Sequence, residues 1–161
     1  MSQRVMSEHI AIVQWNRPDQ AKFTDNRYSR EHIWTFDGGV EVPASSSPDV
    51  VPVPYSNPTC VDPEEAFVAS LSSCHMLWFL SIAAKKKFVV ENYTDQAVGV
   101  MDNNKDGRLA ITIVRLRPQV KFAGSNLPTD QQIQDMHEEA HHSCFLANSV
   151  KTTVIIEAIA S

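Results

Sequence analysis

Two cysteines and the histidines beside them are the residues of this chain best suited to chemistry. Cys74 lies inside a long apolar segment and precedes His75, while Cys144 follows His141 and His142. A cysteine thiolate is a strong nucleophile that oxidises to sulfenic acid and then, with a second thiol, to a disulfide. A single cysteine is more often inert packing, but the polar neighbours of both residues favour reactive thiols.

The position of Cys144 suggests how its thiolate is stabilised. Ser143 is expected to cap a short helix that begins near Cys144, and the positive end of a helix favours a thiolate. The third cysteine, Cys60, lies in a proline-rich segment and is expected to be incidental. Three cysteines without a short repeated spacing argue against a disulfide scaffold.

A second candidate site is the segment from His137 to His141, which fits the HExxH pattern of zinc proteases. In that pattern two histidines one helical turn apart bind the metal and the glutamate activates water. No histidine follows His142, and Glu157 is the only later carboxylate side chain, so a third ligand is not obvious. A metal site in which Cys144 or Cys74 joins His141 or His142 is a further alternative.

The segment from Asp102 to Gly107 resembles the first half of a calcium-binding loop. Its twelfth position, which requires a bidentate glutamate, is Ile113. The segment is therefore interpreted as a hairpin turn.

Composition places the chain among ordinary globular proteins. It has 161 residues, of which 43% are hydrophobic and 20% charged, with a net charge of -5. This length predicts one domain over residues 1–161. No basic stripe suits a nucleic acid, and residues 1–15 hold no continuous apolar stretch that could serve as a signal peptide or membrane anchor. We therefore expect a cytoplasmic protein that binds neither nucleic acid nor membrane.

The expected elements alternate between strands and helices in the manner of an α+β fold with antiparallel sheets. Strands are expected over residues 8–15 and 32–36, followed by a proline-rich loop over 43–58 and a helix from Asp62 to about Lys86. A long hairpin (93–101 and 108–122), a helix (130–142), a short helix near 144 and a strand (152–158) complete the chain.

The long central helix has a strong start signal. Asp62 can cap it, Pro63 suits its first position, and Glu64 favours its positive end. Serines and His75 interrupt the apolar run 66–84, so a buried core helix explains it better than a membrane span. A helix that is apolar nearly all round belongs at the centre of a fold or of a dimer.

Two blocks of the sequence resemble the OsmC/Ohr family of organic hydroperoxide resistance proteins. The segment from Asp62 to Cys74 is similar to the family's first-cysteine helix, with its Asn/Asp-Pro-Glu start and its run of small residues into cysteine. The segment from Cys144 to Val150 is similar to the second-cysteine block. Between them lies the family's order of hairpin and helix, so the resemblance covers about residues 28–160.

This resemblance implies an intertwined homodimer around long central helices and a thiol peroxidase. Cys74 would attack an organic hydroperoxide and Cys144 would resolve the sulfenic acid into a disulfide. Arg30 would polarise the peroxide and Glu64 would hold the arginine, with a dithiol such as a lipoylated protein as reductant. The resemblance implies no metal and no bound organic cofactor.

Three features depart from the commoner family pattern. Phe145 replaces a proline after the second cysteine, His75 follows Cys74, and the segment from Tyr28 to Trp34 lacks a glycine-rich start. The alternative from another class is therefore a non-enzymatic dimeric protein of the same fold that binds an apolar small molecule.

Overall fold

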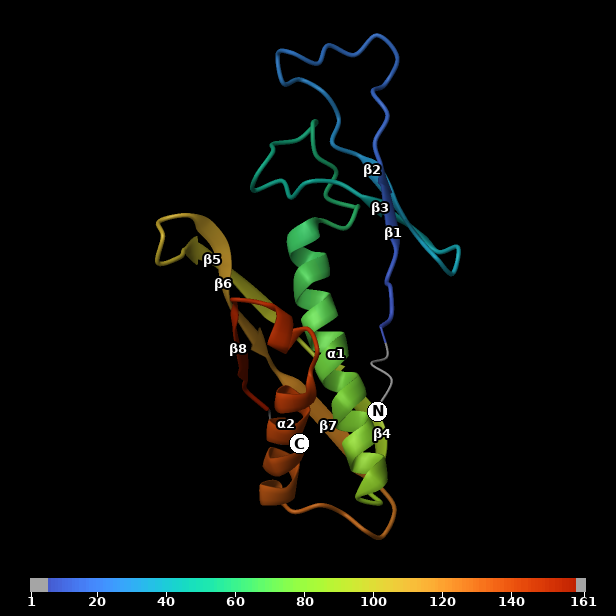
Figure 1. Ribbon diagram of the computed structural model, residues 1–161, viewed down its shortest axis with the longest axis vertical. Helices are drawn as coiled ribbons and strands as arrows, with labels where there is room; N and C mark the ends of the chain where they lie inside the picture. The colour runs from blue at the N-terminus through green and yellow to red at the C-terminus, as the bar shows by residue number, and fades with distance from the viewer. Residues whose placement is uncertain (1–5, 159–161) are drawn as a thin grey trace. The chain divides into compact units, whose positions relative to one another are not determined.

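The computed structural model describes residues 6–158, which pack as two compact units divided between Pro63 and Glu64 (Figure 1). The element order is β1 (Ala11–Gln14), β2 (His32–Phe36), β3 (Glu41–Ala44), α1 (Pro63–Lys85), β4 (Val89–Asp95), β5 (Val98–Asn103), β6 (Leu109–Leu116), β7 (Pro118–Ala123), α2 (Asp130–Ser143), the 3₁₀ helix η1 (Ala147–Ser149) and β8 (Thr153–Ile156). The predicted α+β class is confirmed, whereas the single domain stays a prediction.

The first unit is a three-stranded antiparallel sheet in the order β1-β2-β3. Gly39, at φ 82°, forms the tight turn between β2 and β3. Pro43 lies on β3, where the edge position tolerates a residue without an N–H. The proline-rich segment that follows is a loop, as predicted, and Ser45 anchors it: its N–H donates to Val61 O, and its Oγ accepts from Asn57 N.

Helix α1 opens the second unit and has nearly the predicted bounds. Its C-terminal end is closed by two hydrogen bonds, from Lys87 N to Ala84 O and from Phe88 N to Ala83 O. Lys87 takes the left-handed conformation, with φ 66°. This is the Schellman arrangement, in which a glycine is the more common residue.

The predicted long hairpin is right in its pairing but is broken in the middle. Strand β4 pairs with β7 in one sheet, and β5 pairs with β6 in another. Asp95 lies at the break, where its Oδ1 accepts from Arg117 N at 2.6 Å and its Oδ2 accepts from Ser72 Oγ of α1 at 2.5 Å. These tertiary contacts satisfy groups that a continuous ladder would otherwise pair.

The expectation of purely antiparallel sheets is wrong for one pairing. Strand β8 runs parallel to β6, with Ile113 opposite Thr153, so the sheet β5-β6-β8 is mixed. The chain can return in this direction because α2 and η1 form the crossover between the two strands.

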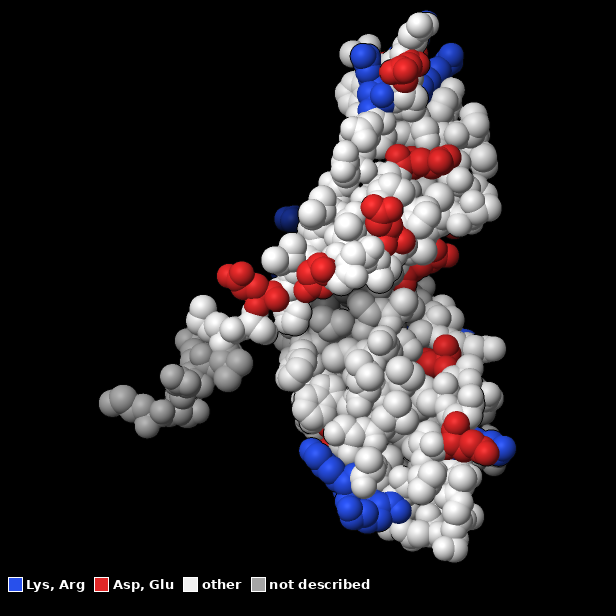
Figure 2. Space-filling model, turned by 90° about the vertical axis from the view of Figure 1, so that its right-hand side faces the viewer, with Lys and Arg blue, Asp and Glu red and all other residues white. Residues whose placement is uncertain are grey.

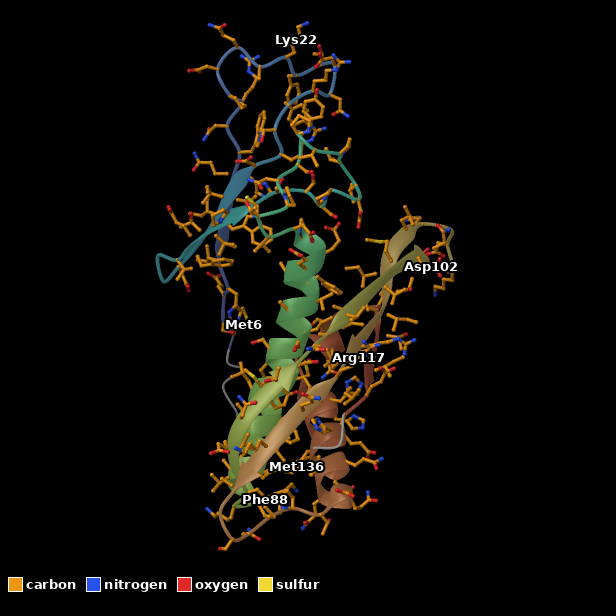
Figure 3. The ribbon with its side chains drawn as sticks, turned by 180° about the vertical axis from the view of Figure 1, so that it is seen from behind. Met6, Lys22, Phe88, Asp102, Arg117 and Met136 are labelled. Atoms are coloured by element: carbon orange, nitrogen blue, oxygen red, sulfur yellow. The ribbon has the colours of Figure 1, made fainter. Side chains whose placement is uncertain are left out.

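Both helices of the second unit lie on one face of its strands, as the two opposite views show (Figures 1 and 3). The larger cluster of buried side chains joins α1, β7 and α2, and Met136 of α2, labelled in Figure 3, is fully buried in it. Its buried members are Phe79, Ile82, Ala83, Phe88, Val120, Met136 and Ala140. A smaller cluster of Leu71, Val114 and Leu116 joins α1 to β6.

Close packing of β5 on α1 depends on Gly99. A Cβ atom at this position would lie 2.6 Å from Val68 Cγ2 of α1, closer than unstrained packing allows. We predict that Gly99→Ala lowers the free energy of unfolding by about 1–3 kcal/mol through overpacking. Gly38→Ala is the control, because a Cβ there meets no atom within 4 Å. Equal midpoints of urea unfolding for the two variants would contradict this account of β5.

By length and hydropathy alone, α1 is the one helix of the described chain that could cross a membrane. Buried core helices pass the same test, so this is weak evidence for a span. Only 28% of the apolar window is buried, however, which leaves much of the helix without cover in the single chain.

Candidate functional site

Cys74 and Cys144, expected from the sequence to work together, are neighbours in the structure. Cys74 lies near the middle of α1 and is half-buried, whereas Cys144 follows α2 and is only 2% exposed. Their side chains share a hydrogen bond, and both thiols are free. The fold therefore brings together two thiols that are 70 residues apart in sequence, by difference of their numbers.

The expected helix start at Cys144 is wrong. Ser143 is the last residue of α2, Cys144 is its C-terminal cap, and η1 begins only at Ala147. The sequence missed this because α2 runs one residue beyond the predicted end. Part of the expected stabilisation survives in another form, since the backbone N–H of Ala147 donates to Cys144 Sγ at 3.4 Å.

The balance of these effects keeps Cys144 protonated. Burial raises its pKa first, and the hydrogen bond with Cys74 raises it further, while the backbone donors at Ala147 and Leu146 act in the opposite sense. The net pKa of Cys144 is about 11. At neutral pH Cys144 is therefore a thiol, which can donate a hydrogen bond to the sulfur of Cys74.

Apolar side chains close to the two cysteines in sequence pack against each other. Trp78, one turn after Cys74, meets Phe145 edge to face with ring centroids 5.4 Å apart. Phe145 is 70% exposed and Leu77 is 60% exposed. The surface next to the two cysteines is therefore apolar. Phe145, which stands where the resembled family commonly has a proline, adds to it.

Two further predicted residues lie on either side of the division between the units. Glu64 is in the first turn of α1, and the regular helix separates it from Cys74 by about 15 Å of rise, so it can act on the thiol only through a bridging cation. Arg30 is in the first unit. Its guanidinium lies over the Tyr28 ring and donates to Asn26 Oδ1 at 2.7 Å. The roles of Glu64 and Arg30 stay predictions. The third cysteine, Cys60, is a half-buried residue of the first unit.

A buried pair of histidines was not foreseen from the sequence. His75 Nε2 and His137 Nδ1 are hydrogen-bonded at 3.0 Å, and the two side chains are 1% and 3% exposed. Phe79 stacks on the His137 ring at 4.3 Å. The apolar periodicity of α2 gave the only available signal, for His137; α1 is apolar nearly all round, so its pattern does not mark His75.

This pair changes the interpretation of the HExxH segment. His137 directs Nδ1 to His75, and no group of three or more His, Cys, Asp or Glu side chains in the described residues is arranged to hold a metal ion. The zinc-protease alternative and the cysteine–histidine metal site therefore lack a ligand set in residues 6–158. The calcium-like segment is a turn, in which Asn104 Oδ1 accepts from Asp106 N and Arg108 N.

The comparison with known families matches these features to one of them. The family model of OsmC-like proteins matches residues 56–158, a range that contains Glu64 and both cysteines of the pair. The chain belongs to the OsmC family. No curated protein matches it.

Solved structures place this OsmC-family chain beside several relatives. An OsmC-like protein of unknown function from Vibrio cholerae is 60% identical, with a TM-score of 0.95 over 96% of this chain and 100% of that one. The organic hydroperoxide resistance protein OhrB of Bacillus subtilis is 16% identical, with a TM-score of 0.68 over 95% and 98%. A corresponding protein from Elizabethkingia anophelis is 16% identical, with a TM-score of 0.66 over 96% of each chain. The two distant relatives establish the shared fold.

Proposed function

We propose that this OsmC-family protein is a thiol-dependent peroxidase that reduces organic hydroperoxides through Cys74 and Cys144. The observation that carries the proposal is the hydrogen-bonded pair of free thiols, of which Cys74 is half-buried and Cys144 is buried. The half-buried sulfur of Cys74 is the one that a substrate can reach, and the buried thiol of Cys144 is the proposed resolving group.

The proposed reaction balances in two steps. The Cys74 thiolate attacks one oxygen of the O–O bond, the bond breaks, and the other oxygen takes a proton and leaves as an alcohol, which gives a sulfenic acid on Cys74. Cys144 then attacks the Cys74 sulfur and water leaves, which forms the disulfide. Two thiols are thus oxidised for each hydroperoxide reduced to alcohol and water.

Several features of the site support this assignment of roles. The proton held on Cys144 stabilises negative charge on the Cys74 sulfur, which is the nucleophile. The apolar side chains of Trp78, Leu77 and Phe145 favour a hydroperoxide with an organic body over hydrogen peroxide. Arg30 and Glu64 are the proposed cation and its carboxylate, and the protein is proposed to act in the cytoplasm.

Thiol titration tests the proposal. After one equivalent of cumene hydroperoxide, the protein should lose two titratable thiols per chain within seconds, and hydrogen peroxide should act more slowly. The competing hypothesis, a non-enzymatic protein that binds an apolar molecule, requires that no thiol be lost on this timescale. The same titration therefore separates the two classes.

A homodimer is part of the proposal. The uncovered apolar side of α1 supports it, and the lower part of Figure 2 shows a wide area of the second unit without charged side chains. We predict that Leu77→Lys, a change at a residue 60% exposed in the single chain, shifts the protein from dimer to monomer in light scattering. Val50→Lys, at a residue 64% exposed in the other unit, should leave the mass unchanged. A Leu77→Lys protein with unchanged mass would contradict this interface.

The reductant is proposed to be a dithiol that attacks Cys74 in the disulfide. Cys144 is buried, whereas Cys74 is half-buried and is the sulfur of the disulfide that a reductant can reach. We predict that acid quenching of the disulfide form during reduction by dihydrolipoamide traps the mixed disulfide on Cys74 in peptide mass spectra. An adduct found mainly on Cys144 would contradict this order. The disulfide can be made with diamide, so the result does not depend on peroxidase activity.

A further inference from the structure

A cavity in the second unit lies between α2, β7 and the end of β8. Its volume is about 590 Å³, within the usual range for sites that hold small organic molecules. Neither Cys74 nor Cys144 lines it. The cavity therefore needs an explanation other than the peroxidase reaction.

Apolar side chains form its walls. Pro118 and Val120 come from β7, Ile133 from α2 and Ile156 from β8. Pro118 is buried below 2% exposure and Val120 is 5% exposed. Such walls favour an apolar body in the ligand, because filling the space removes apolar surface from water.

Two histidines of α2, one turn apart, also belong to this lining. His137 is 3% exposed, and neither its Nε2 nor the Nδ1 of His141 has a hydrogen-bond partner in the described chain. Both nitrogens are themselves buried, so the imidazole rings contribute to the wall of the cavity and not to its polar surface. When His137 Nδ1 carries the proton of its bond to His75, its Nε2 is an acceptor.

The charges around the cavity are negative. Asp130, Glu138 and Glu157 line it, and no lysine or arginine does. Glu157 already forms ion pairs with Arg115 at 2.7 Å and Arg117 at 3.0 Å. Within residues 6–158 the structure gives Glu138 no cation, only the amide of Gln134, which donates to it at 3.1 Å. Glu138 is thus free to attract a positive charge.

From these features we infer that the cavity binds a small organic amine, with its ammonium group near Glu138 and its apolar body against the β7 wall. An ammonium group has only donors, which suits the carboxylate acceptor of Glu138. Burial lowers the pKa of His137 to about 4, so this histidine carries no repelling charge at neutral pH. A carboxylate ligand would instead meet the like charges of Asp130 and Glu138.

A matched series of ligands tests the class of molecule. Calorimetry on the full chain would compare 4-phenylbutylamine, 4-phenylbutanol and 4-phenylbutyrate, which share one apolar body and differ in the head group. We expect the amine to bind with a Kd below about 1 mM, the alcohol at least about fivefold more weakly, and the acid not at all. Equal affinity for amine and alcohol would overturn the cationic head group, and no binding of any member at about 10 mM would overturn the site.

Substitutions locate the site. Glu138→Gln should weaken binding of the amine about fivefold and leave the alcohol unchanged. Gln134→Trp, which fills the cavity from α2, should abolish binding of both, whereas Gln131→Trp in the same helix, outside the lining, should not. Unchanged binding in Gln134→Trp would place the ligand elsewhere. Cys74→Ser should retain binding, so this result stands apart from the peroxidase proposal.

Discussion

Replacing Cys74 by serine is expected to slow the consumption of cumene hydroperoxide by at least about 1000-fold. A serine hydroxyl is not ionised at neutral pH and cannot replace the thiolate as nucleophile. A loss of this size is typical when the nucleophile of a catalytic unit is removed. The measurement is peroxide loss with dihydrolipoamide as reductant, at matched protein concentration.

The other two cysteines provide the controls for this experiment. Cys144→Ser should react once with peroxide and then accumulate sulfenic acid on Cys74, which a dimedone adduct reports. Cys60→Ser should keep the full rate, since the proposed chemistry uses only the thiols of Cys74 and Cys144. Residual turnover in Cys74→Ser close to that of the unmodified protein would contradict the assignment of the nucleophile.

The protein is expected to lose about 3–6 kcal/mol of stability through its buried histidines between pH 7 and pH 4. Burial first, and then His137 and His141, lower the pKa of His75 to about 3, and burial lowers the pKa of His137 to about 4. Their unfolded-state value is about 6.5. Below pH 6.5 the histidines of the unfolded chain therefore bind protons, while those of the folded chain stay neutral. The free energy of unfolding decreases as the pH is lowered, until the pH reaches the folded-state pKa values.

A double substitution isolates this effect. His75→Gln with His137→Asn keeps amide groups at the positions of Nε2 and Nδ1, so the hydrogen bond can survive while titration is removed. Urea unfolding at pH 7, 5.5 and 4 should show a much smaller loss for this variant than for the unmodified protein. His142→Gln, on the exposed side of α2, should follow the unmodified protein. Parallel pH profiles for the double variant and the unmodified protein would refute the role of the pair.

The sequence predicted those elements well whose ends are fixed by residues close to them in the chain. Asp62, Pro63 and Glu64 marked the start of α1, and the turn residues around Gly107 marked the β5–β6 hairpin. The break in the long hairpin could not be predicted, because Asp95 is held there by Arg117 and by Ser72 of another element. Such contacts leave no trace in hydrophobic periodicity.

The candidate site was likewise predicted only in part. Polar neighbours drew attention to Cys74 and Cys144, and their proximity follows from the packing of α1 against the end of α2. The helix start at Cys144 was wrong, because the sequence does not reveal that α2 continues to Ser143. The His75–His137 pair joins residues 62 positions apart, and only the tertiary structure brings the two rings together.

The most direct test of the central claim is to map the disulfide formed by one equivalent of cumene hydroperoxide, using peptide mass spectrometry at neutral pH. The account predicts a single bond between Cys74 and Cys144 of the same chain, formed faster than with hydrogen peroxide, and reduced Cys60. Folded protein whose Cys74 and Cys144 both stay reduced after this treatment would contradict it.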